Sequence, residues 1–226
     1  TEATGSDMGI AHDGDADRCV FVTRDGGYVS GDKSLALMSK HILSKKKGTV
    51  VTPVSSSSLV EEIVRGSGGS VRYTAVGSPV VARKMIETGA VFGGEENGGL
   101  IFPEHQYCRD GGMAVAKMLE CIVKDGPLER QISGFPDYFT VKKKIECPDS
   151  MKKSVLEHVA GESAGAEIDR TDGMKILFSD GWVLIRPSGT EPIFRIFSES
   201  KDEEVAKSRA ETYEVLVKKH LKQGLS

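Results

Sequence analysis

The sequence lacks the features that mark a membrane, secreted or zinc-binding protein. No apolar run approaches the roughly 20 residues that span a bilayer, and no basic, apolar and small-residue signal peptide opens the chain. The four cysteines, Cys19, Cys108, Cys121 and Cys147, show no CxxC spacing and no nearby partner histidines. We therefore expect reduced thiols in a cytoplasmic protein, with no membrane segment and no zinc site.

An excess of charge of one sign is also missing. The chain has 30 Lys and Arg against 33 Asp and Glu, a formal net charge of −3. Its longest basic runs, Lys45–Lys47 and Lys142–Lys144, are typical of solvated faces or strand edges. Because nucleic-acid partners require a clustered basic surface, we expect none here.

Strand-like and helix-like segments alternate in the first part of the chain. We expect strands at Cys19–Thr23, Thr49–Thr52, Val71–Thr74 and Ala90–Phe92, and helices beginning near Leu35, Ser57, Val80 and Asp110. This alternation predicts a mixed, mostly parallel α/β sheet domain with helices on both faces. Before Cys19 there is almost no chain to supply neighbouring strands, so the start is expected to be the remnant of another domain.

The pattern changes after a turn-rich segment around Gly134, Pro136 and Asp137. We expect strands at Phe139–Ile145, Met174–Phe178, Trp182–Arg186 and Ile193–Phe197, with helices at Met151–Val159 and near the C-terminus. Short turns between strands indicate an antiparallel sheet. The second part is therefore predicted to be a small α+β domain.

The stretch AHDGDADRCVF carries three aspartates, Asp13, Asp15 and Asp17, at every second position, and Arg18 follows. Like charges this close repel one another, and hard divalent cations prefer carboxylate oxygens. On an extended chain the alternation would direct the three side chains to one side. A calcium EF-hand is excluded, because Arg18 replaces the required Gly and Arg24 the required Glu. We expect a metal loop here; the competing interpretation is an acidic surface turn balanced by Arg18.

Two further loops carry polar groups suited to ligands. In FGGEENGGLIF, the adjacent carboxylates of Glu95 and Glu96 can accept hydrogen bonds from the vicinal hydroxyls of a sugar. In IRPSGTEP, the Arg186 guanidinium, the hydroxyls of Ser188 and Thr190 and successive backbone N–H groups suit a phosphate. Either stretch can also be a simple turn. We call them the sugar loop (residues 94–99) and the phosphate loop (residues 186–192).

Taken in this order, the three loops resemble those of the α-D-phosphohexomutase family, the phosphoglucomutase/phosphomannomutase group. The matching stretches are DGDADR, GGEENGG and RPSGTEP, and TPVSSSSLVEE, TAVG and RDGGMAVA are also similar. The form GEENGGLIFPEH is most similar to archaeal members. The resemblance implies that residues 1–26 are the end of the family's domain 2, 27–134 its domain 3, and 135–226 its domain 4. The phosphoserine domain would be missing, and the chain alone is expected to be inactive.

The resemblance also implies a mechanism. A phosphoryl group moves reversibly between O1 and O6 of a hexose through a bisphosphate and an enzyme phosphoserine, so the partners are hexose phosphate, hexose bisphosphate and the N-terminal domains of the same protein. The implied roles are Mg²⁺ binding by Asp13, Asp15 and Asp17, catalytic support by Arg18, sugar binding by Glu95, Glu96 and Asn97, and phosphate binding by Arg186, Ser188, Gly189 and Thr190.

Two departures leave the acid/base group open. Many members have histidine at the end of the sugar loop, where Gly99 stands, and lysine where Ala75 stands. The preferred hexose, which is glucose, mannose or glucosamine, is also open, so a phosphoglucosamine mutase is an alternative within the family. Two alternatives come from other function classes. A non-catalytic phosphosugar-binding module and a phosphatase with a nucleophilic aspartate could have the same loops.

Overall fold

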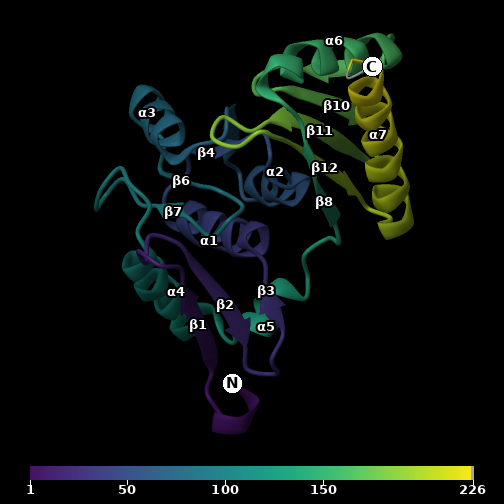
Figure 1. The fold of residues 1–226 in the computed structure, drawn as a ribbon. Helices are drawn as coiled ribbons and strands as arrows, with labels where there is room; N and C mark the ends of the chain where they lie inside the picture. Colours follow the sequence, from purple (N-terminus) through teal and green to yellow (C-terminus); the bar gives the residue numbers. More distant parts are fainter. Residues whose placement is uncertain (225–226) are drawn as a thin grey trace. The chain divides into compact units, whose positions relative to one another are not determined.

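The computed structural model describes residues 1–224 and divides into two compact units, Thr1–Pro136 and Asp137–Ser226 (Figure 1). Unit 1 contains, in chain order, η1 (Glu2–Thr4), β1 (Met8–His12), β2 (Cys19–Thr23), β3 (Tyr28–Val29), α1 (Gly31–Lys45), β4 (Thr49–Pro53), α2 (Ser58–Gly66), β5 (Ser70–Thr74), α3 (Ser78–Thr88), β6 (Phe92–Gly94), β7 (Leu100–Ile101), α4 (Gly111–Asp125) and α5 (Leu128–Ile132).

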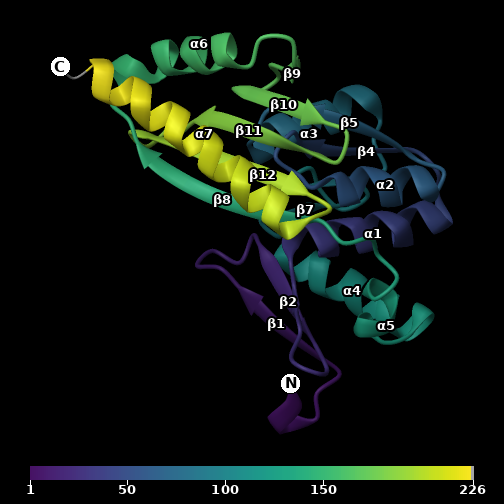
Figure 2. The same cartoon turned by 90° about the vertical axis from the view of Figure 1, so that its right-hand side faces the viewer.

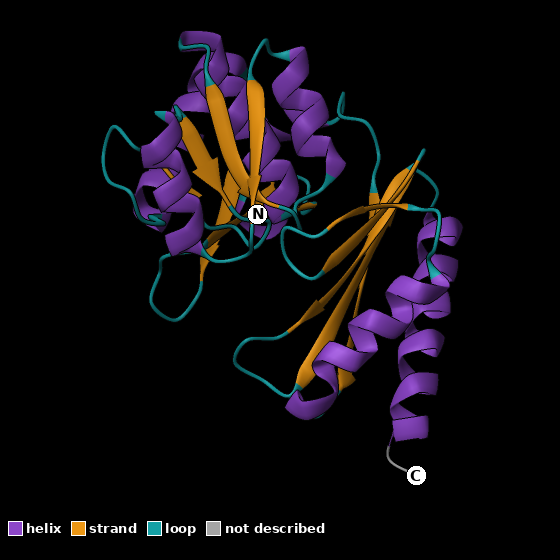
Figure 3. Cartoon of the chain, turned by 90° about the horizontal axis from the view of Figure 1, so that it is seen from above, coloured by secondary structure: helices purple, strands orange, loops and turns teal. Residues whose placement is uncertain are grey.

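The larger sheet of unit 1 has the strand order β5-β4-β6-β7. Strand β4 pairs in parallel with β5 and β6, and β7 returns antiparallel to β6. Side chains of adjacent strand residues point to opposite faces. A Cβ added to Gly93 would meet Met85 of α3, whereas one added to Gly94 would meet Leu35 of α1. Helices therefore cover both faces, which confirms the predicted fold class (Figure 3).

Side-chain caps explain where two of these helices begin. The Ser57 hydroxyl accepts a hydrogen bond from Leu59 N at the start of α2, and the Asp110 carboxylate accepts one from Met113 N at the start of α4. Each cap satisfies a backbone N–H that has no partner within its helix. Ser57 therefore has the capping role that its position predicts.

The structure contradicts one expectation for the first residues, namely that the chain before Cys19 supplies no neighbouring strand. Strands β1, β2 and β3 form an antiparallel sheet in that order, in which Met8 to His12 pair with Thr23 back to Cys19. The segment MGIAH carries two small residues and little alternation, so its sequence gives only a weak strand signal. A smaller difference is the strand expected at Ala90–Phe92, which begins two residues later as β6.

Unit 2 contains β8 (Phe139–Glu146), η2 (Asp149–Met151), α6 (Lys152–Glu162), β9 (Glu167–Asp169), β10 (Met174–Phe178), β11 (Gly181–Pro187), β12 (Ile193–Ser200) and α7 (Glu203–Gly224). The strands form an antiparallel sheet of order β8-β12-β11-β10-β9. Helices α6 and α7 cover one face (Figure 2). Val155 and Val217 of these helices pack with Ile185 and Phe194 of the sheet in one buried core. The predicted antiparallel α+β domain is confirmed.

Among the helices within residues 1–224, none combines the length and the apolar character needed to cross a bilayer.

Candidate active site

The metal loop brings its three aspartates together. One carboxylate oxygen from each of Asp13, Asp15 and Asp17 lies within 4.8 Å of the other two. The loop reaches this geometry as a tight turn, because Ala16 N donates to Asp13 O at 3.2 Å and Ala16 has a positive φ of 58°. The expectation of an extended chain is therefore wrong. Left-handed backbone at a residue with a Cβ is strained, and such strain is typical of ligand-binding loops.

Arg18 is the counter-ion of Asp13. Its backbone N and its Nε donate to the two oxygens of the Asp13 carboxylate, at 3.2 and 2.5 Å. Burial favours the neutral acid, but these hydrogen bonds and the charge of Arg18 outweigh it and hold the pKa of Asp13 below its ordinary value. Asp13 therefore remains ionised at neutral pH.

Arg109 links the metal loop to the sugar loop. Its Nε and one terminal nitrogen donate to Asp17 Oδ2 at 3.0 and 2.6 Å, and the other terminal nitrogen donates to Glu95 Oε2 at 2.9 Å. One planar guanidinium thus fixes two carboxylates that lie 78 positions apart in the chain. The second Asp17 oxygen, Oδ1, is buried and accepts no hydrogen bond from the residues that the structure describes. Arg18 Nε lies 3.7 Å from it.

Glu95 is the most deeply buried acid of the sugar loop, with 2% of the residue exposed. Its Oε1 accepts a hydrogen bond from Gly77 N at 3.1 Å, and its Oε2 is held by Arg109. Burial raises the pKa of Glu95, and the positive charge of Arg109 offsets part of that rise. The carboxylate therefore depends on Arg109 to remain ionised within the protein.

Gly99 lies beneath the Arg109 side chain. A Cβ at this position would approach Arg109 Cδ to 2.2 Å, far inside van der Waals contact. The glycine that departs from the family pattern is thus required by the arginine packed against it. A histidine at position 99 would displace Arg109 from both of its carboxylates.

Two close backbone contacts fix the rest of the sugar loop. Cys19 N, at the end of the metal loop, donates to Gly98 O at 3.1 Å. Gly98 has a φ of +91°, and a Cβ there would lie 2.5 Å from Cys19 O. The side chain of Glu96 reaches the segment between β4 and α2, where its Oε2 accepts from Ser55 Oγ at 3.0 Å. Asn97 Oδ1 accepts from Gly99 N at 3.1 Å within the sugar loop. The metal and sugar loops thus form one site within unit 1.

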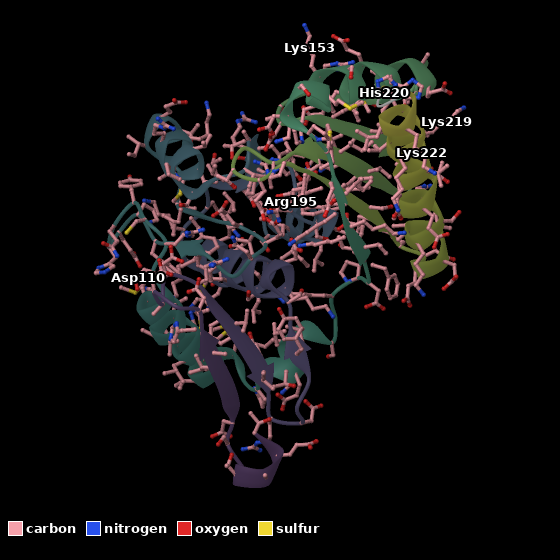
Figure 4. The ribbon with its side chains drawn as sticks, viewed as in Figure 1. Asp110, Lys153, Arg195, Lys219, His220 and Lys222 are labelled. Carbon is pink, nitrogen blue, oxygen red and sulfur yellow. The ribbon has the colours of Figure 1, made fainter. Side chains whose placement is uncertain are left out.

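The beginning of α4 packs against the metal loop. Asp110, which lies at the N-terminal end of α4, caps the helix and contacts Nε2 of His105 at 3.2 Å (Figure 4). Its pKa is lowered, first by the Met113 N–H bond. A Cβ at the next residue, Gly111, would lie 2.4 Å from Ala16 O. This close approach positions Arg109, which stands immediately before Asp110, over the aspartates.

The phosphate loop belongs to unit 2 and follows β11. Arg186 Nε donates to Asp172 Oδ2 at 2.5 Å, which orients the guanidinium. The buried Ser188 hydroxyl accepts from the backbone N–H groups of Thr190 and Glu191 at 3.4 and 3.2 Å. An added Cβ at Gly189 would meet no atom within 4 Å, so the tip of the loop is open.

Lys152, at the start of α6, contacts two backbone carbonyls of the phosphate loop. Its ammonium group donates to Ser188 O at 2.6 Å and to Glu191 O at 2.9 Å. Lys152 and Asp172 were not expected from the sequence, because both lie outside the loop. Arg109 also lies outside the three loops, in the stretch RDGGMAVA, and is not predicted as a site residue from the sequence.

Comparison with known proteins shows the family of the chain. Residues 30–138 match the phosphoglucomutase/phosphomannomutase alpha/beta/alpha domain III, and residues 143–214 match the C-terminal domain of the same family. The chain belongs to the phosphoglucomutase/phosphomannomutase family. The resemblance expected from the three loops is thereby confirmed.

Individual members of this family match almost the whole chain. A phosphoglucomutase/phosphomannomutase of Thermococcus kodakarensis is 43% identical over 98% of the chain and 49% of the relative. A probable phosphoglucosamine mutase of Methanopyrus kandleri is 42% identical over 96% of the chain and 49% of the relative. The crystal structure of a family protein from Burkholderia thailandensis has a TM-score of 0.86 at 26% identity, covering 99% of the chain and 48% of that protein. The chain thus spans about half the length of the curated relatives it matches.

Proposed function

We propose that this chain provides the metal, sugar and phosphate loops of a phosphohexomutase that interconverts hexose 1-phosphate and hexose 6-phosphate. The segments would be the end of domain 2 (residues 1–26), domain 3 (27–134) and domain 4 (135–226). Phosphoryl transfer would use an enzyme phosphoserine contributed by the N-terminal domains of the same protein. Support comes from family membership together with the joined metal and sugar loops.

The metal loop fits Mg²⁺. Three carboxylates converge on one point, and the buried Asp17 Oδ1 has no hydrogen-bond donor among residues 1–224, as a metal ligand would. Asp13, Asp15 and Asp17 would hold the ion, which, when bound, supplies positive charge to the transferring phosphoryl group. Arg18 fixes Asp13 and Arg109 fixes Asp17, so the carboxylates need little rearrangement to bind it.

The sugar and phosphate loops would bind the substrate. Glu95 and Asn97, with Glu96 beside them, carry acceptors for sugar hydroxyls, because carboxylate and amide oxygens each have two lone pairs. Arg186, Ser188, Gly189 and Thr190 would hold the phosphate that is not reacting. A phosphate anchor suits a substrate that must bind in two orientations, since both ends of the bisphosphate intermediate present the same group.

The observation that carries this proposal is the Arg109 bridge. A simple acidic turn would not need a part-buried arginine that joins Asp17 to the buried Glu95 carboxylate. A phosphatase using Asp13 as its nucleophile is not favoured, because hydrogen bonds from Arg18 to both oxygens make the carboxylate a weaker nucleophile. Each oxygen keeps a lone pair with which it can still bind a metal ion.

Calorimetric titration of Mg²⁺ into the chain tests the metal site. We expect one site, which Asp15→Asn weakens by about tenfold or more through loss of a ligand. Asp7→Asn is the matched control, because Asp7 is an exposed aspartate paired with Arg24 outside the loop. Equal Mg²⁺ affinity in the wild-type protein and Asp15→Asn would refute the site.

Turnover of the full-length gene product separates the enzyme from a non-catalytic binding module. We expect conversion of hexose 1-phosphate to 6-phosphate, abolished by Asp15→Asn and preserved in Asp7→Asn. Binding of glucose 1,6-bisphosphate with no turnover would favour the module. Glucosamine 1-phosphate should be compared with glucose 1-phosphate, because the Methanopyrus kandleri relative bears the name probable phosphoglucosamine mutase.

A further inference from the structure

A second cluster of metal-binding side chains lies between helices of unit 1 and shares no residue with the three loops. His41 of α1 and Cys121 and Asp125 of α4 each place one potential ligand atom within 4.8 Å of the other two. His41 Nδ1 lies 3.1 Å from Asp125 Oδ2, and Cys121 Sγ lies 4.0 Å from the same oxygen. Gln131 Oε1 of α5 lies 3.1 Å from Cys121 Sγ.

Two of the three residues of this cluster, His41 and Cys121, are buried. Cys121 is fully buried and His41 is 3% exposed. The second ring nitrogen of His41, Nε2, is also buried and makes no hydrogen bond with any residue in 1–224. A buried imidazole nitrogen without a partner costs free energy unless another arrangement satisfies it.

A cavity of about 430 Å³ gives access to the cluster. His41, Asp125 and Gln131 line it, together with Leu37, Lys40, Ser44, Arg130 and Gly134. The Asp125 side chain is 44% exposed, so one ligand faces the solvent side. The cavity therefore gives an ion access to His41 and Asp125, and Cys121 lies behind them outside the cavity lining.

The separations suit a tetrahedral ion. With metal–ligand bonds of about 2.0 to 2.3 Å, ligand atoms around zinc are about 3.3 to 3.8 Å apart. The two separations that involve Asp125, 3.1 and 4.0 Å, bracket that range, and the His41–Cys121 separation is within 4.8 Å. Side-chain movements of up to about 1 Å would therefore bring the three atoms to tetrahedral spacing. Sulfur and imidazole nitrogen donors select zinc-class ions over Mg²⁺, which prefers oxygen.

We propose that His41, Cys121 and Asp125 form a binding site for a divalent cation of the zinc class. The fourth position is filled by Gln131 Oε1 or by water from the cavity. The ion would join α1 and α4, which gives the site a structural role distinct from phosphoryl transfer.

Neighbouring charges support this arrangement. With Nδ1 bound to the ion, Nε2 would carry the ring proton. Glu120 Oε1 lies 3.7 Å from Nε2 and would need to move closer to accept that proton as the outer carboxylate of a histidine ligand does. Glu120 Oε1 also accepts a hydrogen bond from Lys45. On binding the ion, the Cys121 thiol would release its proton to solvent, because the thiolate is the metal ligand.

Optical titration with Co²⁺ tests the site on the whole chain, with excess Mg²⁺ present to occupy the metal loop. We expect a near-ultraviolet thiolate-to-cobalt charge-transfer band and visible bands of tetrahedral cobalt that saturate at one equivalent. Zn²⁺ should displace them. Cys121→Ser should remove the charge-transfer band, and Cys108→Ser, which changes an exposed free thiol, should retain it.

Asp125→Asn provides a variant that keeps the thiol and nearly the same shape. It should retain the charge-transfer band but weaken cobalt binding by about tenfold or more. This variant decides the matter if circular dichroism shows that Cys121→Ser does not fold. Absence of the band in wild-type protein with excess Co²⁺ would overturn the proposal. So would loss of the band in Cys108→Ser, or unchanged affinity in Asp125→Asn.

Discussion

Replacing Arg109 by methionine removes the bridge between the metal loop and the sugar loop while keeping a long apolar stem. The Glu95 side chain is only 3% exposed and would retain a single hydrogen bond, from Gly77 N. Asp17 would lose both of its bonds to the guanidinium. The substitution therefore leaves a buried carboxylate without its counter-ion.

The destabilisation caused by Arg109→Met depends on how deeply the ion pairs of Arg109 are buried. Removing one partner of a fully buried ion pair costs about 3 to 5 kcal/mol. Arg109 and Asp17 have side chains 22% and 28% exposed, so water screens part of the loss. We expect the low end, about 3 kcal/mol, which corresponds to a change of about a hundredfold in the local unfolding equilibrium.

Amide hydrogen exchange measured by mass spectrometry separates the two units. Peptides from β2, β6 and β7 should exchange about a hundredfold faster in Arg109→Met, and peptides from unit 2 serve as an internal reference. The single tryptophan, Trp182, lies in unit 2, so its fluorescence does not report on this change. Arg24→Met is the matched control, because its ion pair with Asp7 is exposed.

The deficit of Arg109→Met should depend on pH in a defined direction. Burial already raises the pKa of Glu95 above its unfolded value, and loss of Arg109 raises it further. A raised native pKa means that stability is retained at low pH and lost as pH rises through that pKa. The deficit should therefore grow from acid to neutral pH. Adding Glu95→Gln should recover about 2 kcal/mol. A pH-independent deficit with no recovery in the double variant would refute the reasoning.

Three further outcomes are expected. Gly99→Ala should destabilise unit 1 by about 1 to 3 kcal/mol in hydrogen exchange, because its Cβ overlaps Arg109, whereas Gly14→Ala, with nothing within 4 Å, should be neutral. Asp110→Ala should lower the free energy of unfolding measured in urea by about 1 kcal/mol above pH 4. The difference from wild type should fade at lower pH, because the pKa of Asp110 is depressed and its carboxylate becomes protonated there. A difference that stays constant with pH would contradict this. Lys152→Met should weaken calorimetric binding of glucose 1,6-bisphosphate severalfold by loosening the phosphate loop, and unchanged affinity would argue against that support role.

Most of the fold could be predicted because local signals agree with it. Strand β2 at Cys19–Thr23 has β-branched and apolar residues, and Ser57 and Asp110 are good helix caps. The first sheet was missed because β1 is stabilised by pairing with β2 rather than by its own composition. Strand propensity depends on packing against the neighbouring strand, so the composition of one strand by itself predicts it only weakly.

The site was only partly predictable for a similar reason. The spacing of the three aspartates predicts a metal site. Arg109, in contrast, lies 92 residues after Asp17 in the chain and contacts it only in the folded structure. Gly99 looked like a missing catalytic residue, although its Cβ position is occupied by Arg109. The cluster of His41, Cys121 and Asp125 has no sequence signal, because its histidine and aspartate are 84 residues apart and no CxxC spacing marks its cysteine.

The charges of the assembled site explain why three aspartates can remain so close. Asp13 is held by Arg18, whereas Asp17 and Glu95 share Arg109, and Asp15 is exposed. Two guanidiniums against these four carboxylates leave two negative charges, and the neighbouring Glu96 adds to the negative potential at Glu95. A divalent cation would offset the two charges left on the four carboxylates, and the buried oxygen of Asp17 can serve as a ligand. A monovalent ion would offset only half of that charge, so the same balance favours a divalent over a monovalent cation.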